Sequence, residues 1–200
     1  MTDFLIATNN AHKVEEFKRI LLPLGINVIS AKDAGIDLGD VVEDGKTFAE
    51  NAKIKALSAF RKSGLPSIAD DSGLCVDALS GAPGIYSARF GGEDIPQSHR
   101  NELLLSEMQK SNISSRAARF VSSICCVFAE DDIIAVEGVC EGTIAHSPCG
   151  DGGFGYDPLF IYEDGRCFGT ISGDEKDKVS HRGRSLRALR DKLISRKDVL

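Results

Sequence analysis

Two adjacent carboxylates are the strongest sign of chemistry in this sequence. Asp70 and Asp71 follow a short apolar segment at residues 67–69, which we expect to be a strand. In α/β proteins, active sites gather at the carboxyl ends of such strands. Neighbouring residues of an extended segment point to opposite sides, so one carboxylate could hold a metal ion or a water while the other orients a neighbouring base. Asp70-Asp71-Ser72-Gly73 is also an acceptable turn sequence, and the pattern alone leaves both interpretations open.

A third acid and a lysine lie upstream of this pair. Together with the two aspartates, Glu43 would give the hard oxygen ligands of an Mg²⁺ site, which usually has one or two carboxylates completed by water and substrate phosphates. Lys55 lies at the edge of the apolar side of a helix expected over residues 47–61. It could neutralise a phosphate, or simply extend along the apolar surface into solvent. Glu50 is explained by the capping-box spacing from Thr47.

The turn after the first expected strand could bind an anion. Thr8-Asn9-Asn10-Ala11-His12-Lys13 connects a strand at residues 4–7 to a helix at residues 12–22, where backbone N–H groups and the positive helix end can meet a phosphate. Thr8 and Asn10 could hydrogen-bond phosphate or sugar oxygens, and Lys13 adds a cation. The glycines of a Walker loop are absent. Alternatively, an asparagine merely caps the helix and Lys13 is a solvated residue of its first turn.

Two later segments could recognise a base. Residues 150–158 are rich in glycine and contain Phe154 and Tyr156, which could stack on a base or could pack back onto the sheet as anchors of the loop. Residues 174–184 place five basic side chains, counting His181, ahead of the last expected helix. These groups could counter phosphates or read an acceptor on a base, although such a mixed-charge run is ordinarily a solvated connection.

The elements that position these residues predict one α/β domain over residues 1–200. Apolar patterning predicts strands at residues 4–7, 26–30, 67–69 and 159–162, and a long hairpin at 119–129 and 133–144. It predicts helices at 12–22, 47–61 and 97–109 and a final helix with Leu186, Leu189, Leu193 and Ile194 facing inward. The loop at residues 81–92 is long for a compact domain, and the sequence does not decide whether it closes over a substrate or builds a dimer contact.

Composition excludes several classes of function. The net charge of −6 argues against nucleic-acid binding, which needs a basic face. The apolar run near the start is too short for a signal peptide or a membrane span, so we expect a cytoplasmic protein without a membrane partner. No cysteine pair has the spacing of a zinc site, and we expect all six cysteines to be reduced and mostly buried: Cys75, Cys125, Cys126, Cys140, Cys149 and Cys167.

Taken together, six segments resemble the family of inosine and xanthosine triphosphate pyrophosphatases in order and spacing, over nearly the whole chain. Each segment is weak alone, but six in register make a specific pattern. The segments are Thr8-Asn9-Asn10-Ala11-His12-Lys13, Thr47-Phe48-Ala49-Glu50-Asn51-Ala52, Ala69-Asp70-Asp71-Ser72-Gly73-Leu74, Gly81-Ala82-Pro83-Gly84-Ile85-Tyr86-Ser87-Ala88-Arg89, Gly153-Phe154-Gly155-Tyr156-Asp157-Pro158 and Ser180-His181-Arg182-Gly183.

The resemblance implies an elongated mixed β-sheet flanked by helices, two lobes with a central nucleotide cleft, and a homodimer. It implies that the triphosphate binds Lys55 and the turn Thr8-Asn9-Asn10-Ala11-His12-Lys13. Glu43 and Asp71 would bind Mg²⁺, and either Asp71 or Asp70 would activate the attacking water.

On the base side, the resemblance implies that Ser72 lies at the substrate and that the segment Phe154-Gly155-Tyr156-Asp157 holds the purine. Lys176, His181 and Arg182 would read its 6-oxo edge. The chain departs from the residues we expect in the family, which are more often charged or larger polar ones, at Cys149, Thr170 and Gly173.

The implied reaction converts non-canonical purine nucleoside triphosphates (ITP, dITP and XTP) to the monophosphate and pyrophosphate. A pyrophosphatase for pyrimidine or methylated nucleotides would keep the acids and lysines but need a different base pocket. A module that only senses nucleotides would not require Asp70, Asp71 and Glu43 together, so the three acids favour catalysis. The sequence does not rank the three substrates or give the number of magnesium ions.

Overall fold

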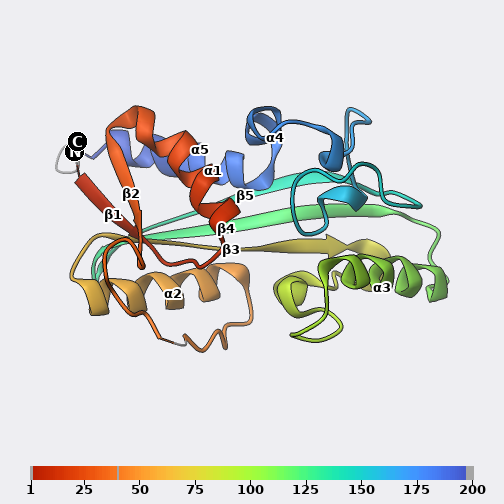
Figure 1. The fold of residues 1–200 in the computed structure, drawn as a ribbon, viewed down its shortest axis with the longest axis horizontal. Coiled ribbons are helices and arrows are strands. Elements are labelled where there is room, and N and C mark those ends of the chain that lie inside the picture. Colours follow the sequence, from red (N-terminus) through yellow and green to blue (C-terminus); the bar gives the residue numbers. More distant parts are fainter. Residues whose placement is uncertain (1, 40, 197–200) are drawn as a thin grey trace. The chain divides into compact units, whose positions relative to one another are not determined.

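The computed structural model describes residues 2–39 and 41–196; Met1, Asp40 and residues 197–200 of the predicted domain lie outside the described residues. Six strands are hydrogen-bonded in the order β2-β1-β3-β4-β5-β6 (Figure 1). Strand β1 pairs in parallel with β2 and β3, whereas β6 pairs antiparallel with β5. The predicted α/β fold with a mixed sheet is therefore confirmed. The strands are β1 (Thr2–Ile6), β2 (Ile26–Ser30), β3 (Ser67–Val76), β4 (Ala117–Ala129), β5 (Asp132–Ile144) and β6 (Phe160–Tyr162).

Five α-helices accompany the strands in the described part of the chain. They are α1 (Ala11–Leu21), α2 (Phe48–Ser63), α3 (Gln97–Lys110), α4 (Gly173–Val179) and α5 (His181–Ile194). Among the described residues, none of these helices has both the length and the apolar character needed to cross a membrane. Short 3-10 helices connect them, of which η3 (Gly84–Arg89) and η5 (Phe168–Thr170) bear on the site.

The chain divides into two compact units. Unit 1 comprises Met1–Asp71, Ser122–Gly138 and His181–Leu200, and unit 2 comprises Ser72–Val121 and Val139–Ser180. The boundaries fall within β3, β4 and β5, and before the first residue of α5. Each unit has its own packed core.

Unit 1 has three layers, because its strands bury both faces. In β1, Phe4 and Ile6 pack with apolar side chains of α1 and α5, whereas Leu5, and Ala7 just after the strand, pack with the alanines of α2. This period of two is the alternation of an extended strand. Figure 1 shows α1 and α5 on one side of these strands and α2 on the other. Alternate residues along a central strand therefore face either α1 and α5 or α2.

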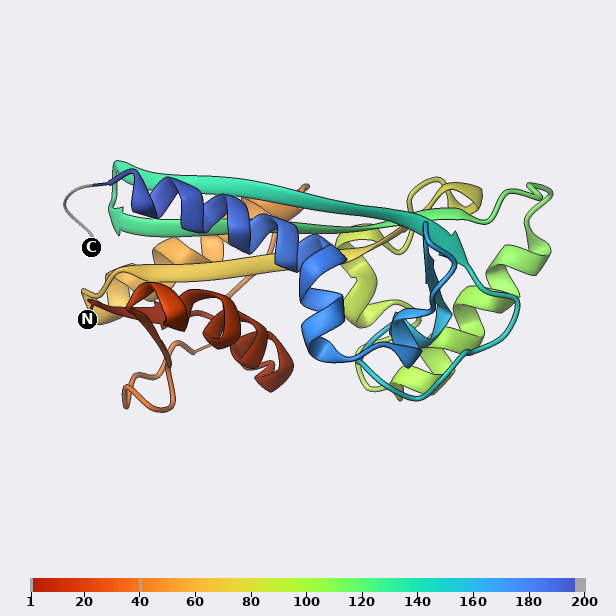
Figure 2. The same cartoon turned by 90° about the horizontal axis from the view of Figure 1, so that it is seen from above.

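Helix α5 lies along β5, and a glycine makes this approach possible. A side chain at Gly138 would collide with the backbone of His181 and Ser185 at the start of α5. Further along, Lys192 Nζ donates to the carbonyl of Ala135 at 3.1 Å. Figure 2 shows α5 running beside these strands next to α1. The close approach places the first turn of α5 directly over the sheet of unit 1.

Unit 2 is held by an aromatic core between α3, the strands and the segment after β6. The ring of Phe160 lies 4.7 Å from that of Phe120 and 4.9 Å from that of Phe168, measured between centroids. Leu104 and Met108 of α3 are buried in the same core, as predicted from their helical spacing. The predicted hairpin is also confirmed, since only residues 130–131 separate the neighbouring strands β4 and β5.

The structure excludes two of the alternative interpretations and shows that one prediction, the inward-facing Ile194, is wrong. Asp70–Gly73 is not a turn, because β3 continues through it to Val76. Residues 174–184 are not a solvated connection, because they form α4 and the start of α5 with several buried charged side chains. Ile194 is 53% exposed, because it follows Leu193 and so lies about 100° around α5 from the buried stripe.

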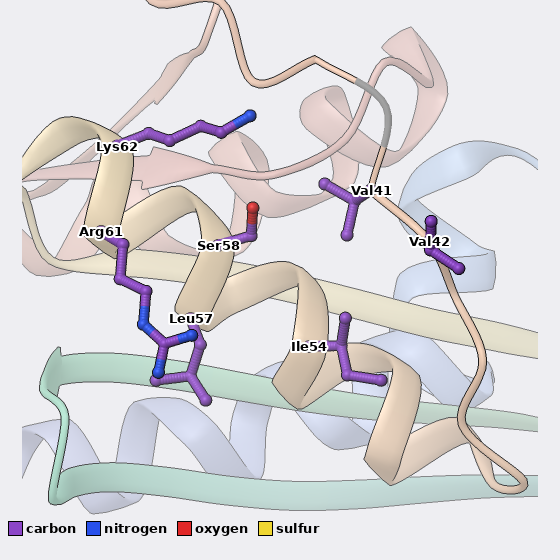
Figure 3. A pocket seen from close by; sticks show the side chains of 7 residues that line it. All are labelled: Val41, Val42, Ile54, Leu57, Ser58, Arg61 and Lys62. Atoms are coloured by element: carbon purple, nitrogen blue, oxygen red, sulfur yellow. The ribbon is translucent and has the colours of Figure 1, made fainter.

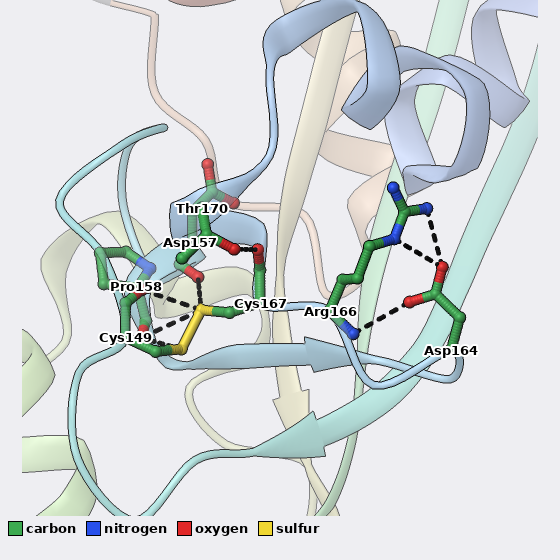
Figure 4. The surroundings of a disulfide bond; sticks show 7 residues. All are labelled: Cys149, Asp157, Pro158, Asp164, Arg166, Cys167 and Thr170. Carbon is green, nitrogen blue, oxygen red and sulfur yellow. Dashed lines mark hydrogen bonds and ion pairs between the residues drawn. A yellow bond between two sulfur atoms is a disulfide. The ribbon is translucent and has the colours of Figure 1, made fainter.

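The prediction that all cysteines are reduced is also wrong. Cys149 and Cys167 form a disulfide (Figure 4), while the other four cysteines are free, and three of those are buried. The spacing of 18 residues gives no signal of pairing in the sequence. The bond depends on β6 returning the chain to the start of the glycine-rich loop.

The packing of α5 gives a direct test of unit 1. We expect Leu189→Ala to lower the free energy of unfolding by about 2–5 kcal/mol, because Leu189 is fully buried against α1 and the sheet. Ile194→Ala is the matched control on the same helix, and its effect should lie within about 0.5 kcal/mol because the side chain is exposed. Urea unfolding followed by circular dichroism measures both. Equal losses in the two variants would contradict the assigned helix face.

Candidate active site

Asp70 lies on the face of β3 that packs against α1 and α5, in a buried network of charged side chains. Lys13 Nζ of α1 is 2.7 Å from Asp70 Oδ2. Arg182 of α5 donates to the same oxygen from Nε at 3.3 Å and from Nη2 at 3.2 Å. Ser122 Oγ of β4 donates to Asp70 Oδ1 at 2.6 Å, and Arg182 Nη1 donates to Glu16 Oε2 at 2.5 Å. Two acids and two cations thus balance one another.

This network holds Asp70 in its ionised form. Burial alone would raise the pKa of Asp70, but Arg182 and Lys13 outweigh burial and place the pKa well below its usual range. Burial lowers the pKa of Lys13, although the Asp70 carboxylate opposes that shift. A carboxylate that is 2% exposed and accepts from several donors is a poor proton acceptor. Asp70 therefore orients Lys13 and Arg182.

Asp71 belongs to the opposite face of β3 and contacts α2. Lys55 Nζ lies 2.7 Å from Asp71 Oδ1 and 3.2 Å from Glu43 Oε2, so one ammonium joins two carboxylates that are far apart in the sequence. Asn51 Nδ2 donates to Asp71 Oδ2 at 3.4 Å. The Oδ1 of the same asparagine accepts from Gly45 N at 2.9 Å. Helix α2 therefore positions both Asp71 and the segment that contains Glu43.

The electrostatics of this second site differ from those around Asp70. Burial raises the pKa of Asp71, which Lys55 opposes, and the pKa stays above its usual value. Burial lowers the pKa of Lys55, but Asp71 and Glu43 outweigh burial and raise it, so the lysine stays protonated. A carboxylate with a raised pKa binds a proton more readily. Asp71 is thus the better proton acceptor of the two aspartates.

The turn before α1 is ordered by its own side chains. Asn10 Oδ1 accepts from the backbone of His12 at 3.0 Å and of Lys13 at 3.3 Å, which makes Asn10 the N-cap of α1. Asn10 N donates to Thr8 Oγ1 at 3.2 Å. The capping interpretation therefore describes Asn10, whereas the interpretation of Lys13 as a solvated residue is wrong. The turn leaves Asn9, Ala11 and His12 exposed.

In unit 2, a buried ion pair supports the glycine-rich segment of residues 150–158, which we call the Phe154 loop. Lys176 Nζ of α4 lies 2.6 Å from Asp157 Oδ2, and both side chains are almost fully buried. The same oxygen accepts from Phe154 N at 2.8 Å. Lys176 Nζ also lies 4.4 Å from the centroid of the Phe154 ring. The ion pair therefore holds both the backbone and the ring of Phe154, which is itself partly exposed.

Two further contacts fix the Phe154 loop within unit 2. Tyr156 is buried, and its hydroxyl donates to the carbonyl of Ser87 in η3 at 3.0 Å. Asn101 Nδ2 of α3 donates to the carbonyl of Gly155 at 3.3 Å. Tyr156 is therefore an anchor of the loop. The ring of Phe154 is partly exposed, so it could still stack on a base. The 81–92 segment, which includes η3, supports this loop.

A hollow of about 490 Å³ lies beside α2, outside the groups described above (Figure 3). Its walls combine side chains of α2 with those of the segment just before Glu43. Val41 and Ile54 give it an apolar lining, and Arg61 at its edge is paired with Glu130. The hollow therefore contains none of the predicted site residues.

Glu43 and Asp71 have the donor chemistry that magnesium prefers. Within residues 2–39 and 41–196, no group of three or more His, Cys, Asp or Glu side chains is arranged to hold a metal ion. Mg²⁺ does not require such a group, because it commonly binds one or two carboxylates and completes its octahedron with water and substrate phosphates. Since Glu43 and Asp71 both contact the one ammonium of Lys55, they can face a single cation. The two carboxylates therefore fit a magnesium ion.

The Ham1 family model matches residues 4–192 of the chain. The chain belongs to the Ham1 family. This Ham1 chain is similar to the dITP/XTP pyrophosphatase of Clostridium perfringens, with 46% identity over 96% of the chain and 98% of that relative. It is also similar to the dITP/XTP pyrophosphatase of Thermus thermophilus, with 44% identity over 92% of the chain and 88% of that relative. The predicted resemblance to inosine and xanthosine triphosphate pyrophosphatases is confirmed.

Solved structures of the Ham1 family have the same fold. A HAM1 protein from Coxiella burnetii superposes with a TM-score of 0.90 and 36% identity, over 98% of the chain and 100% of that structure. A nucleoside-triphosphatase / dITP/XTP pyrophosphatase from Mycobacterium abscessus superposes with a TM-score of 0.74 and 40% identity, over 94% and 98%.

The Ham1 fold distributes the predicted site residues over both units. Unit 1 contains the turn before α1, the acids, Lys55, His181 and Arg182, whereas unit 2 contains Ser72, the Phe154 loop and Lys176. Arg182 and Lys176 were predicted to act together on a base. In the structure, Arg182 is paired with Asp70 and Glu16, and Lys176 is paired with Asp157; their role at the base stays a prediction.

Sequence reasoning missed several residues of the Ham1 site. Glu16 completes the Asp70 network, and its signal was its position one helical turn after Lys13. Asn51 contacts Asp71, but it looked like part of the helix start. Ser122 lies in a mostly apolar strand, and no local signal indicated its hydrogen bond with Asp70.

The two aspartates should differ sharply in their contribution to stability. We expect Asp70→Asn to lower the free energy of unfolding by about 3–5 kcal/mol, because it removes the shared partner of two buried cations. Asp71→Asn should cost about 1 kcal/mol or less, because the raised pKa of Asp71 means that its ionised form adds no stability at neutral pH, and Lys55 keeps Glu43 as a partner. Urea unfolding of both variants at neutral pH measures the difference.

The Asp70 contribution should also depend on pH. Because the pKa of Asp70 is depressed in the folded chain, its stabilisation is present above the unfolded value of about 3.9 and is lost as pH falls through the folded pKa. The gap between the wild type and Asp70→Asn should therefore shrink below about pH 4. A gap that stays constant down to pH 2 would contradict the depressed pKa.

Proposed function

We propose that this chain hydrolyses non-canonical purine nucleoside triphosphates (ITP, dITP and XTP) to the nucleoside monophosphate and pyrophosphate. The observation behind the proposal is the double site on β3, where Asp70 fixes two cations and Asp71 faces Lys55 and Glu43. Such a site suits a highly charged phosphate ester. Its Ham1 relatives bear the name dITP/XTP pyrophosphatase, which gives the substrate class.

Unit 1 supplies the groups for the triphosphate. Lys13, held by Asp70, presents a cation at the first turn of α1, where the positive helix end also favours an anion. The exposed backbone and side chains of Asn9, Ala11 and His12 lie at the same turn. We assign the phosphate chain to this turn, including Thr8 and Asn10, and assign a phosphate oxygen to Lys55.

Asp71 is the residue that we assign to water activation. Among the described residues, Asp71 Oδ2 accepts only a long contact of 3.4 Å from Asn51 and is available to take a proton from the water that attacks the α-phosphorus, whereas Asp70 is saturated with donors. Lys55 orients the Asp71 carboxylate in the resting chain and would neutralise charge on the phosphate as pyrophosphate leaves. Asp70 is then a positioning residue for Lys13 and Arg182.

Glu43 and Asp71 would hold Mg²⁺. When bound, the ion would supply positive charge against the phosphate oxygens. Asn51 keeps both carboxylates in place, because its amide contacts Asp71 and the backbone beside Glu43.

Unit 2 supplies the groups for the base. Phe154 offers a partly exposed ring for stacking, while Tyr156 and the Asp157–Lys176 pair hold the loop in place. We assign Ser72 and Gly155 to the substrate surface. We assign reading of the 6-oxo edge to Lys176, His181 and Arg182, whose donors match a 6-oxo acceptor and do not match a 6-amino group.

We further propose that the protein acts in the cytoplasm on the free nucleotide pool and that it does so as a homodimer. The support for both is membership of the Ham1 family. Neither nucleic acid nor a membrane is needed as a partner in this reaction.

The reaction is tested by a substrate panel with product identification. With Mg²⁺, we expect the chain to release pyrophosphate from ITP, dITP and XTP with a kcat/KM roughly 10²-fold or more above that for ATP or GTP, since a site built on hydrogen bonds discriminates strongly. Coupled enzyme assays distinguish pyrophosphate from orthophosphate. Orthophosphate as the first product would refute the proposal, and equal rates on ATP would refute the base assignment.

The acids are tested by Asp71→Asn and Glu43→Gln. Asp71→Asn should lower kcat by about 10²–10⁴-fold while the fold is retained, as expected for loss of a general base. Glu43→Gln should raise the Mg²⁺ concentration needed for half-maximal activity, and a chelator should abolish turnover of the wild type.

Glu50→Gln is the matched control for Glu43→Gln. Glu50 is an acid on the first turn of α2, and its carboxylate accepts from the backbone of Lys46. Its amide analogue keeps an acceptor, so the Mg²⁺ requirement should stay at the wild-type value. A shift of the same size in both variants would contradict the metal assignment.

A further inference from the structure

The disulfide of unit 2 encloses the whole Phe154 loop in a covalent ring. Cys149 is the residue just before the loop, and Cys167 is the residue just before η5. Between them lie the loop, β6 and the turn that follows it. The bond therefore joins the entrance of the loop to the segment that leads from Cys167 into η5 (Figure 4).

Glycines allow the loop and η5 to touch without side chains between them. A side chain at Gly150 would collide with the backbone of Gly169, and a side chain at Gly169 would collide with the backbone of Cys149. Gly152 N donates a hydrogen bond across this contact to the carbonyl of Gly169 at 2.9 Å. The Cys149–Cys167 disulfide adds a covalent link across this close backbone contact.

The same contact extends to Phe154 through η5 and α4. Phe168 of η5 is buried, and its ring lies 5.9 Å from Lys176 Nζ. That ammonium pairs with Asp157 and lies over the ring of Phe154. A shift of η5 relative to Cys149 would therefore move the supports of the Phe154 ring.

We propose that the Cys149–Cys167 disulfide is a positioning element for the Phe154 loop, and that it increases nucleotide affinity and base selectivity without touching the substrate. The inference rests on the proposed function, because it takes Phe154 as the ring that stacks on the base. The acids and Lys55 belong to unit 1, whereas the ring closed by the disulfide belongs to unit 2. The disulfide should accordingly affect KM and selectivity while leaving kcat unchanged.

The bond can be broken in a balanced exchange with a small dithiol. The dithiol gives two electrons and two protons, the S–S bond breaks, each cysteine sulfur becomes a thiol, and the dithiol closes to its own disulfide. Cys149 is partly exposed, so a reagent can reach the bond in the folded protein.

Two measurements on the purified full-length chain test the proposal. Thiol titration of the unfolded protein should count four free thiols among the six cysteines before dithiothreitol, and all six after it. Reduction of the folded protein should raise the KM for ITP about five-fold, because complete loss of a stacking contact weakens binding by roughly five- to a hundredfold. The ratio of kcat/KM for ITP over ATP should fall with it.

Variants separate the disulfide from other effects of the reductant. Cys149→Ser/Cys167→Ser should show the raised KM without reductant and should not respond to it. Cys75→Ser, which removes a free thiol elsewhere in unit 2, should keep both the wild-type KM and the response to reductant. If the double variant fails to fold, the reduced wild type still gives the comparison, because it keeps both side chains.

Six free thiols in the untreated protein would overturn the proposal, as would an unchanged KM and selectivity on reduction, or a fall in kcat alone. If no purine triphosphate yields pyrophosphate even from the oxidised protein, the proposed function fails instead. In that case, calorimetric titration with ITP of the oxidised and reduced forms still tests positioning, since reduction should weaken binding.

Discussion

Strand β3 sends successive side chains to opposite faces of a sheet that is covered on both sides in unit 1. Ile68 and Asp70 therefore belong with α1 and α5, and Ala69 and Asp71 with α2. Two identical carboxyl groups, one peptide apart, thereby acquire different partners and pKa shifts in opposite directions. The remaining features of unit 1 depend on this split, because each helix brings its cation to the aspartate on its own side.

The chain has a net negative charge, yet it concentrates cations where a phosphate would bind. Lys13 and Lys55 are each neutralised by an aspartate in the resting protein, so neither is an isolated buried charge. Burial makes such pairs costly unless the partners are well placed, which explains the further support from Glu16, Ser122 and other hydrogen-bonding groups. The contacts that offset the cost of burying these charged side chains also fix their orientation.

The sequence predicted local structure better than contacts between distant segments. Local patterns were enough for the order of strands and helices and for the cap at Asn10, because these depend on residues close together in the chain. The opposite placement of Asp70 and Asp71 followed from strand geometry once the segment was taken as extended. What could not be predicted were contacts over long sequence separations, such as Arg182 with Glu16 and the disulfide of Cys149. These depend on how the whole sheet brings distant segments together.

Gly138 has no reactive group, yet it determines where a charged side chain of the candidate site lies. Its missing side chain lets the first turn of α5 approach β5, and Arg182 lies in that turn. A larger residue there would push the helix away and withdraw the guanidinium from Asp70, even though no reacting group had been altered. In a genetic screen, such an allele would be scored as an active-site lesion. Substitutions that impair this site can therefore occur at residues that would not contact a nucleotide.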